Sequence, residues 1–238
     1  MRASESETRV CVVTGVGPGN GASISRKFSS EGYRVAMLAR SRERLEELEG
    51  QIPRSLGIPT DVRDPAALRA AFARIRQELG PPAVVVHNAG SGLFKEFMDT
   101  TPEELEESWR TNALALLVCG QEAARDMLEA GRGAIVVIGA TASLRGLPHT
   151  APFASAKSAQ RSLAQSMARS LGPKGIHVSY LVIDGVIDVP GARAFFPDKP
   201  DDFFLKPDSI AETVWNVVNQ ERSAWTFELD VRPFGEKW

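Results

Sequence analysis

The stretch "TGVGPGNGASI" (residues 14–24) joins an apolar run, residues 9–14, to a helical pattern. Its glycines allow a tight turn and a close approach of the backbone to a ligand. A glycine turn between a first strand and a first helix presents the amides of the helix N-terminus to a pyrophosphate. Such a cluster also fits an ordinary tight loop. Its placement favours the dinucleotide-binding interpretation.

Outside this turn the chain alternates short apolar runs with helical patterns. The runs "RVAMLA", "AVVVH", "GAIVVI" and "IHVSYLVI" are typical of parallel strands covered on both faces, and "SLGIP" and "TFELDV" are weaker strand signals. Helices are predicted from Thr101 to about Leu128, opened by a capping box, and from about Ala154 to Leu171. The pattern predicts an α/β fold: a single Rossmann-type doubly wound parallel sheet with helices on both faces.

The composition and the ends of the chain narrow the possible functions. We expect residues 1–8 to form a flexible tail and residues 9–238 to form one dinucleotide-binding domain. A net charge of −2 gives no sign of nucleic-acid binding. The histidines and cysteines lack metal-ligand spacing, so we predict no metal site, and the cysteines read as small buried hydrophobes. No apolar run is long enough to span a bilayer, and we expect a cytoplasmic protein.

The segment Thr14-Gly15-x-x-x-Gly19-x-Gly21 resembles the T-G-x-x-x-G-x-G fingerprint of the short-chain dehydrogenase/reductase superfamily. "HNAG" resembles its N-N-A-G, "TDV" its adenine-contacting turn, and "LGPKGIHVSYLVIDG" the strand before its P-G turn, so the match covers nearly the whole chain in order. The resemblance implies that the coenzyme contacts Thr14, Gly15, Gly19, Asn20, Gly21, Asp61, Val62, Asn88, Ala89, Gly90, Lys157, Gly185 and Ile187.

The residues after the second apolar run bear on the coenzyme. An NAD enzyme usually places a carboxylate there to bind the ribose 2′-hydroxyl. This chain has Ala39 there, followed by Arg40 and Ser41. A guanidinium binds a 2′-phosphate through charge-assisted hydrogen bonds, so we predict that NADP(H) is preferred over NAD(H), held by Arg40 with Ser41 as a second contact. The alternative is a solvated charge at the start of a helix.

The segment "IGATASLRGLPHTAPFASAK" aligns with the catalytic region of that superfamily. The resemblance implies a Tyr that transfers a proton, a Lys four residues later, an upstream Ser, and an Asn that supports a relay water. Here Phe153 occupies the Tyr position, Lys157 is retained, Asn112 matches the Asn, and Ala140 occupies the Ser position. Candidate replacement proton donors are Ser143, which we rank first, Thr141, His149 and water.

Two functions fit these residues. The first is an NADP(H)-dependent oxidoreductase that transfers hydride to or from a small carbonyl, alcohol or enone substrate, with a non-standard proton donor. The second is a catalytically impaired NADP-binding sensor or regulatory protein, which the absent hydroxyls favour. The resemblance also implies a homodimer or homotetramer.

Overall fold

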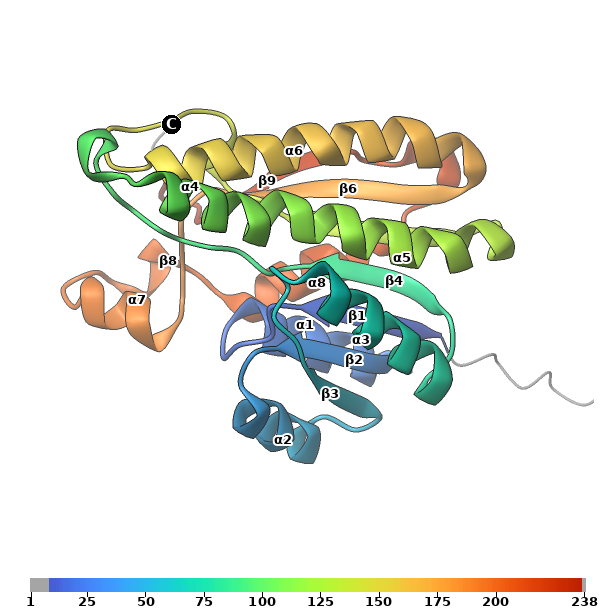
Figure 1. Cartoon of the computed structure of the whole chain (residues 1–238). Coiled ribbons are helices and arrows are strands. Elements are labelled where there is room, and N and C mark those ends of the chain that lie inside the picture. The colour runs from blue at the N-terminus through green and yellow to red at the C-terminus, as the bar shows by residue number, and fades with distance from the viewer. Residues whose placement is uncertain (1–8, 237–238) are drawn as a thin grey trace, which may run out of the picture.

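The computed structural model describes residues 9–236, so the predicted tail, residues 1–8, lies outside the described residues. Within the described range, seven parallel strands form one sheet in the order β3-β2-β1-β4-β5-β6-β9 (Figure 1). This topology confirms the doubly wound prediction. The strands, in sequence order, are β1 Val10–Thr14, β2 Arg34–Ala39, β3 Ser55–Pro59, β4 Pro82–His87, β5 Gly133–Ile138, β6 Ile176–Ile183 and β9 Glu228–Val231.

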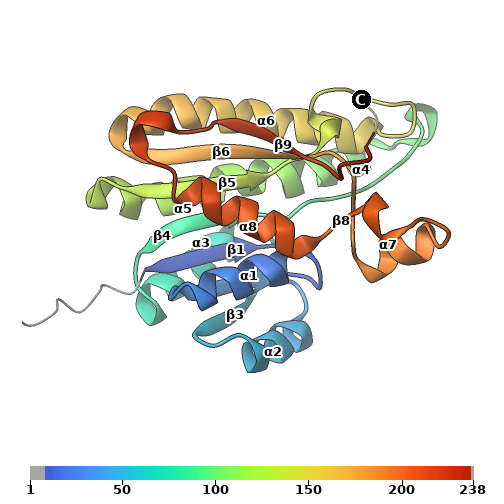
Figure 2. The ribbon, with the colours of Figure 1, turned by 180° about the vertical axis from the view of Figure 1, so that it is seen from behind.

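Helices cover both faces of the sheet, and each face has its own apolar core (Figures 1 and 2). One face packs against α1 Asn20–Ser30, α2 Arg42–Gln51 and α8 Pro207–Val218. The opposite face packs against α3 Pro65–Glu78, α5 Ala115–Ala130 and α6 Ala151–Leu171. Both cysteines are buried free thiols, as the sequence predicted. Burial raises the pKa of Cys119 to about 12.

The predicted helix from Thr101 contains a widened turn. Its first part, α4 Pro102–Trp109, begins with the predicted capping box between Thr101 and Glu104. A π-helical segment, Arg110–Leu114, follows and leads directly into α5. Such segments interrupt the regular hydrogen-bond ladder and often occur at functional sites. This one contains Asn112, whose side chain is fully buried.

The chain after β6 forms a small subdomain beside the sheet. Strand β7, Val186–Ile187, pairs with β8, Phe204–Leu205, and α7, Pro190–Phe195, lies between them in sequence. Arg193 binds Asp188 at 2.7 Å and Asp201 at 2.6 Å, so ion pairs connect α7 to its neighbouring segments.

Candidate coenzyme and active site

A cavity of about 890 Å³ opens at the carboxyl ends of the central strands. The strand order reverses between β1 and β4, which is where doubly wound sheets bind ligands. The cavity brings together many of the predicted coenzyme contacts. These are Gly15, Arg40, Ser41, Asp61, Val62, Asn88, Ala89 and Gly90.

The glycine turn forms one wall of the cavity. Gly15 has φ of 69°, and a Cβ there would lie 2.5 Å from the Ala89 Cα, so only glycine fits. Gly19 caps α1 without any side-chain hydrogen bond, which leaves the first amides of the helix for an anionic ligand. Beside them Asn20 is buried and its Oδ1 has no protein partner. The glycine turn and the helix amides fit a bound pyrophosphate, whereas the Asn20 oxygen can only accept a hydrogen bond and would need a donor.

Thr14 and Asn88 hold the turn against β4. The Thr14 hydroxyl accepts from the Ala89 amide at 3.2 Å and lies 3.1 Å from Nδ1 of His87. Asn88 donates from Nδ2 to the Gly15 carbonyl at 2.8 Å. These two side chains therefore shape the turn from behind, and Thr14 itself is fully buried.

The end of β2 gives the cavity a basic corner. Arg40 and Arg44 both line it, and both are exposed. No ion pair joins Arg40 to another residue in the range 9–236, so its guanidinium is available to a ligand. Ser41 instead caps α2: its Oγ accepts from the Arg44 amide at 3.3 Å and donates to Glu43 at 3.0 Å. Arg44 was not among the predicted contacts, although its place one turn into α2 is readable from the sequence.

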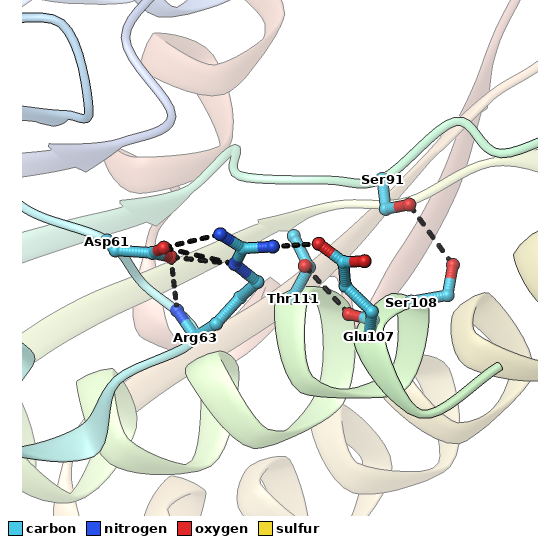
Figure 3. Close-up of polar contacts among 6 residues, drawn as sticks. All are labelled: Asp61, Arg63, Ser91, Glu107, Ser108 and Thr111. Atoms are coloured by element: carbon cyan, nitrogen blue, oxygen red, sulfur yellow. Dashed lines mark hydrogen bonds and ion pairs between the residues drawn. The ribbon is translucent and has the colours of Figure 1, made fainter. Parts of the chain in front are cut away.

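Three charged residues that line the cavity form a chain of ion pairs (Figure 3). Asp61 accepts from Arg63 through both carboxylate oxygens, and this pairing lowers the pKa of Asp61. Arg63 also pairs with Glu107 of α4. Sequence reasoning identified Asp61 but missed Arg63 and Glu107, because α4 approaches the β3–α3 loop only in the folded chain.

Two of the positions predicted to be catalytic, Phe153 and Lys157, lie on α6, which begins at Ala151 rather than at about Ala154 as predicted. Phe153 therefore sits in the first turn, four residues before Lys157 and on the same face. Its ring is half-buried and lies 5.2 Å from the ring of Phe94. Ala140 precedes a short 3₁₀ turn, Thr141–Ser143, and brings no hydroxyl to the site.

The candidate replacement donors are differently placed. Ser143 is buried, and its hydroxyl donates to the Ala140 carbonyl at 2.7 Å, so its proton is already engaged. Thr141 is half-buried in the same turn. His149 is exposed, with its ring centroid 6.3 Å from that of Phe94.

Lys157 does not line the cavity itself but lies beside Gly90, which does. Its side chain is buried, and Nζ donates to the Ile138 carbonyl at 2.9 Å and to Gln160 Oε1 at 3.0 Å. A Cβ placed on Gly90 would lie 3.5 Å from both Lys157 Nζ and Asn112 Oδ1, so each of these groups lies beside Gly90. Burial lowers the pKa of Lys157 to about 7. Burial, followed by the charge of Lys157, lowers the pKa of His87 to about 3, so this imidazole is neutral.

Replacing Lys157 with Met should change how stability depends on pH. The pKa of Lys157 falls from its ordinary 10.5 to about 7 on folding, so between these values the unfolded chain binds more protons. The wild-type free energy of unfolding therefore rises with pH in this window by up to about 1.4 kcal/mol per unit, and this gain is lost progressively as the pH falls from 10.5 to about 7. Chemical denaturation at about pH 7.5 and about pH 9 gives the free energy of unfolding at each pH. Its increase between the two should be about 2 kcal/mol larger for the wild type than for Lys157→Met. Equal gains would contradict this pKa.

Of the remaining predicted contacts, Ile187 lies beside the glycine turn, and Gly185 lies against Pro233 and Leu205. A Cβ on Gly19 would meet Val189 at 2.6 Å and Ile187 at 4.0 Å, so β7 and the segment after it adjoin the turn. Gly185 has φ of 150°, which L-residues rarely adopt, and it directs the chain from β6 into β7. Gly21 packs against the Val16 backbone, where a Cβ would lie 2.6 Å from its Cα.

This combination of sheet, glycine turn and basic corner defines a dinucleotide-binding Rossmann protein. The family model of the short chain dehydrogenases matches residues 9–199. The chain belongs to this family of NAD(P)-dependent oxidoreductases. Within residues 9–236 no group of His, Cys, Asp and Glu could hold a metal ion, and no helix has the length and apolar character needed to span a membrane.

Three similar proteins illustrate the match. A short-chain dehydrogenase from Rhodopseudomonas palustris is 35% identical, with a TM-score of 0.82 over 95% of this chain and 99% of that one. An alcohol dehydrogenase from the archaeon Thermococcus sibiricus, solved with 5-hydroxy-NADP, is 27% identical, with a TM-score of 0.87 over 97% and 99%. L-xylulose reductase from Mus musculus is 31% identical over 191 residues, 80% of this chain and 76% of that protein.

Proposed function

We propose that the protein is an NADP(H)-dependent oxidoreductase that transfers hydride to or from a small carbonyl, alcohol or enone substrate. The observation that carries the coenzyme choice is the basic corner at the end of β2. Arg40 and Arg44 line the cavity there, and Ala39 stands where an NAD enzyme carries an acid. The NADP-type ligand of the Thermococcus sibiricus relative supports the same choice.

Some of the residues that would hold the coenzyme line the cavity, and the others are the remaining contacts that the resemblance implies. Arg40 would bind the 2′-phosphate, the amides at the start of α1 the pyrophosphate, and Lys157 with Asn88 and Gly90 the nicotinamide half. Asp61 and Val62 would contact adenine, and Gly185 and Ile187 would close the nicotinamide side. The coenzyme bound there supplies or accepts the hydride.

Proton supply separates this protein from the usual pattern of its family. Reduction of a carbonyl leaves an alkoxide that must be protonated or strongly hydrogen-bonded. Phe153 and Ala140 provide neither, and the Ser143 proton is engaged by a carbonyl. Ser143, Thr141 and His149 are therefore weaker donors than a positioned Tyr, and water remains a candidate. A conjugated double bond or an activated carbonyl places the smallest demand on such a donor.

The absent hydroxyls also favour a second function, an NADP-binding sensor or regulatory protein. Phe153 packs its ring against the exposed ring of Phe94, so the position of the missing donor makes an aromatic contact. Coenzyme binding would persist, because none of the groups at the basic corner or the glycine turn depends on a proton donor.

The two functions differ in turnover. NADPH oxidation should be followed spectrophotometrically across a panel of ketones, aldehydes and enones, after NADPH binding has been measured by fluorescence. The oxidoreductase proposal predicts turnover for at least one activated substrate. Tight NADPH binding with no turnover across the panel would favour the sensor.

We also propose that the chain forms a homodimer or homotetramer in the cytoplasm. Large apolar side chains are exposed on α4 and α5, and a second copy of the chain would cover them: Leu105, Trp109, Leu117 and Leu128. Sedimentation velocity should give a mass of two or four chains. A monomer at micromolar concentration would refute this assembly.

A further inference from the structure

Gln160 joins two groups that both belong to the candidate active site. It lies on α6, three residues after Lys157, and its side chain is fully buried. Its Oε1 accepts from Lys157 Nζ at 3.0 Å, and its Nε2 donates to the main-chain carbonyl of Asn112 at 3.1 Å. One amide thus connects α6 to the π-helical segment between α4 and α5.

The chemistry of the two partners fixes the orientation of this amide. An ammonium group only donates, so the amide oxygen must face Lys157. A carbonyl only accepts, so the amide nitrogen must face Asn112. If the Gln160 amide were flipped, its nitrogen would face the Lys157 ammonium, donor against donor. Its oxygen would face the Asn112 carbonyl, acceptor against acceptor, and burial would keep water from satisfying either pair. The bridge therefore has a single orientation.

We propose that Gln160 is a positioning residue that fixes the Lys157 ammonium in the coenzyme site. The resemblance implies a relay water supported by Asn112, and the side-chain amide of Gln160 occupies the place of that water. An amide does not exchange protons as a water does, so Lys157 has no proton path toward Asn112 through this bridge. Lys157 is then a fixed cation behind Gly90. This role fits a site in which Phe153 has no hydroxyl for Lys157 to act on.

The groups around Lys157 leave its charge state sensitive to this one contact. Strand β5 contributes the Ile138 carbonyl, and β4 contributes the neutral imidazole of His87. Strand β6 contributes Tyr180, whose hydroxyl lies 3.5 Å from the Lys157 main-chain carbonyl and whose pKa burial raises to about 12. Asn112, on the π-helical segment, brings no charge. No carboxylate in residues 9–236 pairs with Lys157, so the two neutral acceptors stabilise its ammonium.

The test is an NMR titration of the full-length protein with [¹³Cε]lysine, without coenzyme. The Lys157 signal is assigned by its absence in Lys157→Arg. Gln160→Leu removes an acceptor from the ammonium and should lower the Lys157 pKa by about one unit or more. Gln160→Glu places a carboxylate at the same position and should raise it by about one to three units. Gln165→Leu makes the same change at a half-buried position of α6 that contacts neither group, and should leave the pKa unchanged.

Coenzyme binding provides a second measurement of the role of Gln160, and this measurement rests on the proposed function. At neutral pH, Gln160→Leu should weaken NADPH binding about tenfold and Gln165→Leu should not, because a misplaced or neutral Lys157 binds the coenzyme less well. If Gln160→Leu does not fold, the upward shift of the Lys157 pKa in Gln160→Glu still tests the proposal. An unchanged Lys157 pKa in every folded Gln160 variant overturns the proposal. Expected pKa shifts with no NADPH binding by the wild type would instead refute the proposed function alone.

Discussion

Phe153→Tyr is expected to raise the rate of carbonyl reduction by about 10²- to 10⁴-fold, the usual contribution of a positioned general acid. Position 153 lies one helical turn before Lys157 on α6, so the new hydroxyl would share a face with a cation that lowers its pKa. NADPH consumption with the same panel of ketones and aldehydes measures the change. Adding Ala140→Ser should increase the rate again, because it supplies a second hydrogen-bond donor near the substrate oxygen.

Phe94→Tyr provides the matched control for this experiment. It adds the same hydroxyl to the ring that packs against Phe153, but away from the helical register of Lys157. This variant should stay at the wild-type rate. If Phe153→Tyr binds NADPH as the wild type does and yet gains no activity, the missing hydroxyl is not what limits the reaction.

Arg40→Ala is expected to weaken NADPH binding about 100-fold while leaving NADH binding nearly unchanged. The loss corresponds to charge-assisted hydrogen bonds between one guanidinium and a 2′-phosphate, which NADH lacks. Arg40 is exposed at the cavity rim and makes no ion pair within residues 9–236, so its removal should leave the fold intact. Fluorescence titration with both coenzymes measures the two affinities.

Arg42→Ala is the control for this charge. Arg42 opens α2 two residues later and is exposed, but it does not line the cavity. Its removal should change the ratio of NADPH to NADH affinity by less than about threefold, as expected for a distant, screened charge. An unaltered ratio in Arg40→Ala would assign the coenzyme preference to another residue.

Local patterns were sufficient to predict much of the fold. The apolar runs gave the central strands, and even the weak segment Ser55–Pro59 forms β3. The capping box at Thr101 forms as predicted. These features depend on residues within a few positions of one another, so their physical causes are readable from the sequence.

Features that depend on tertiary contacts were not predictable in this way. The π-helical turn at Arg110–Leu114 has no marker residue in the sequence, and only the folded chain places the Asn112 carbonyl against Gln160. The early start of α6, at Ala151, was hidden by Pro152, which suits the first turn of a helix as well as a loop. Strands β7 and β8 are two residues each and lack any periodicity.

The candidate site likewise combines features that the sequence predicts with features that only the folded chain shows. The glycine turn and Lys157 follow from motifs, whereas the engagement of Ser143 by the Ala140 carbonyl is a matter of local geometry. Gln160 had a usable signal, since a residue three positions after Lys157 shares its helical face. Its partner Asn112 lies 48 residues away in sequence, and no pattern indicated that contact.

The most direct test of the central claim is a titration of the wild-type protein with NADPH and with NADH, followed by nucleotide fluorescence. We expect saturable binding of NADPH at one site per chain, at least about tenfold tighter than that of NADH, because only NADPH offers a 2′-phosphate to Arg40. Equal affinities for NADPH and NADH would show that the basic corner does not select the coenzyme. Failure of both coenzymes to bind would contradict the account of the site as a whole.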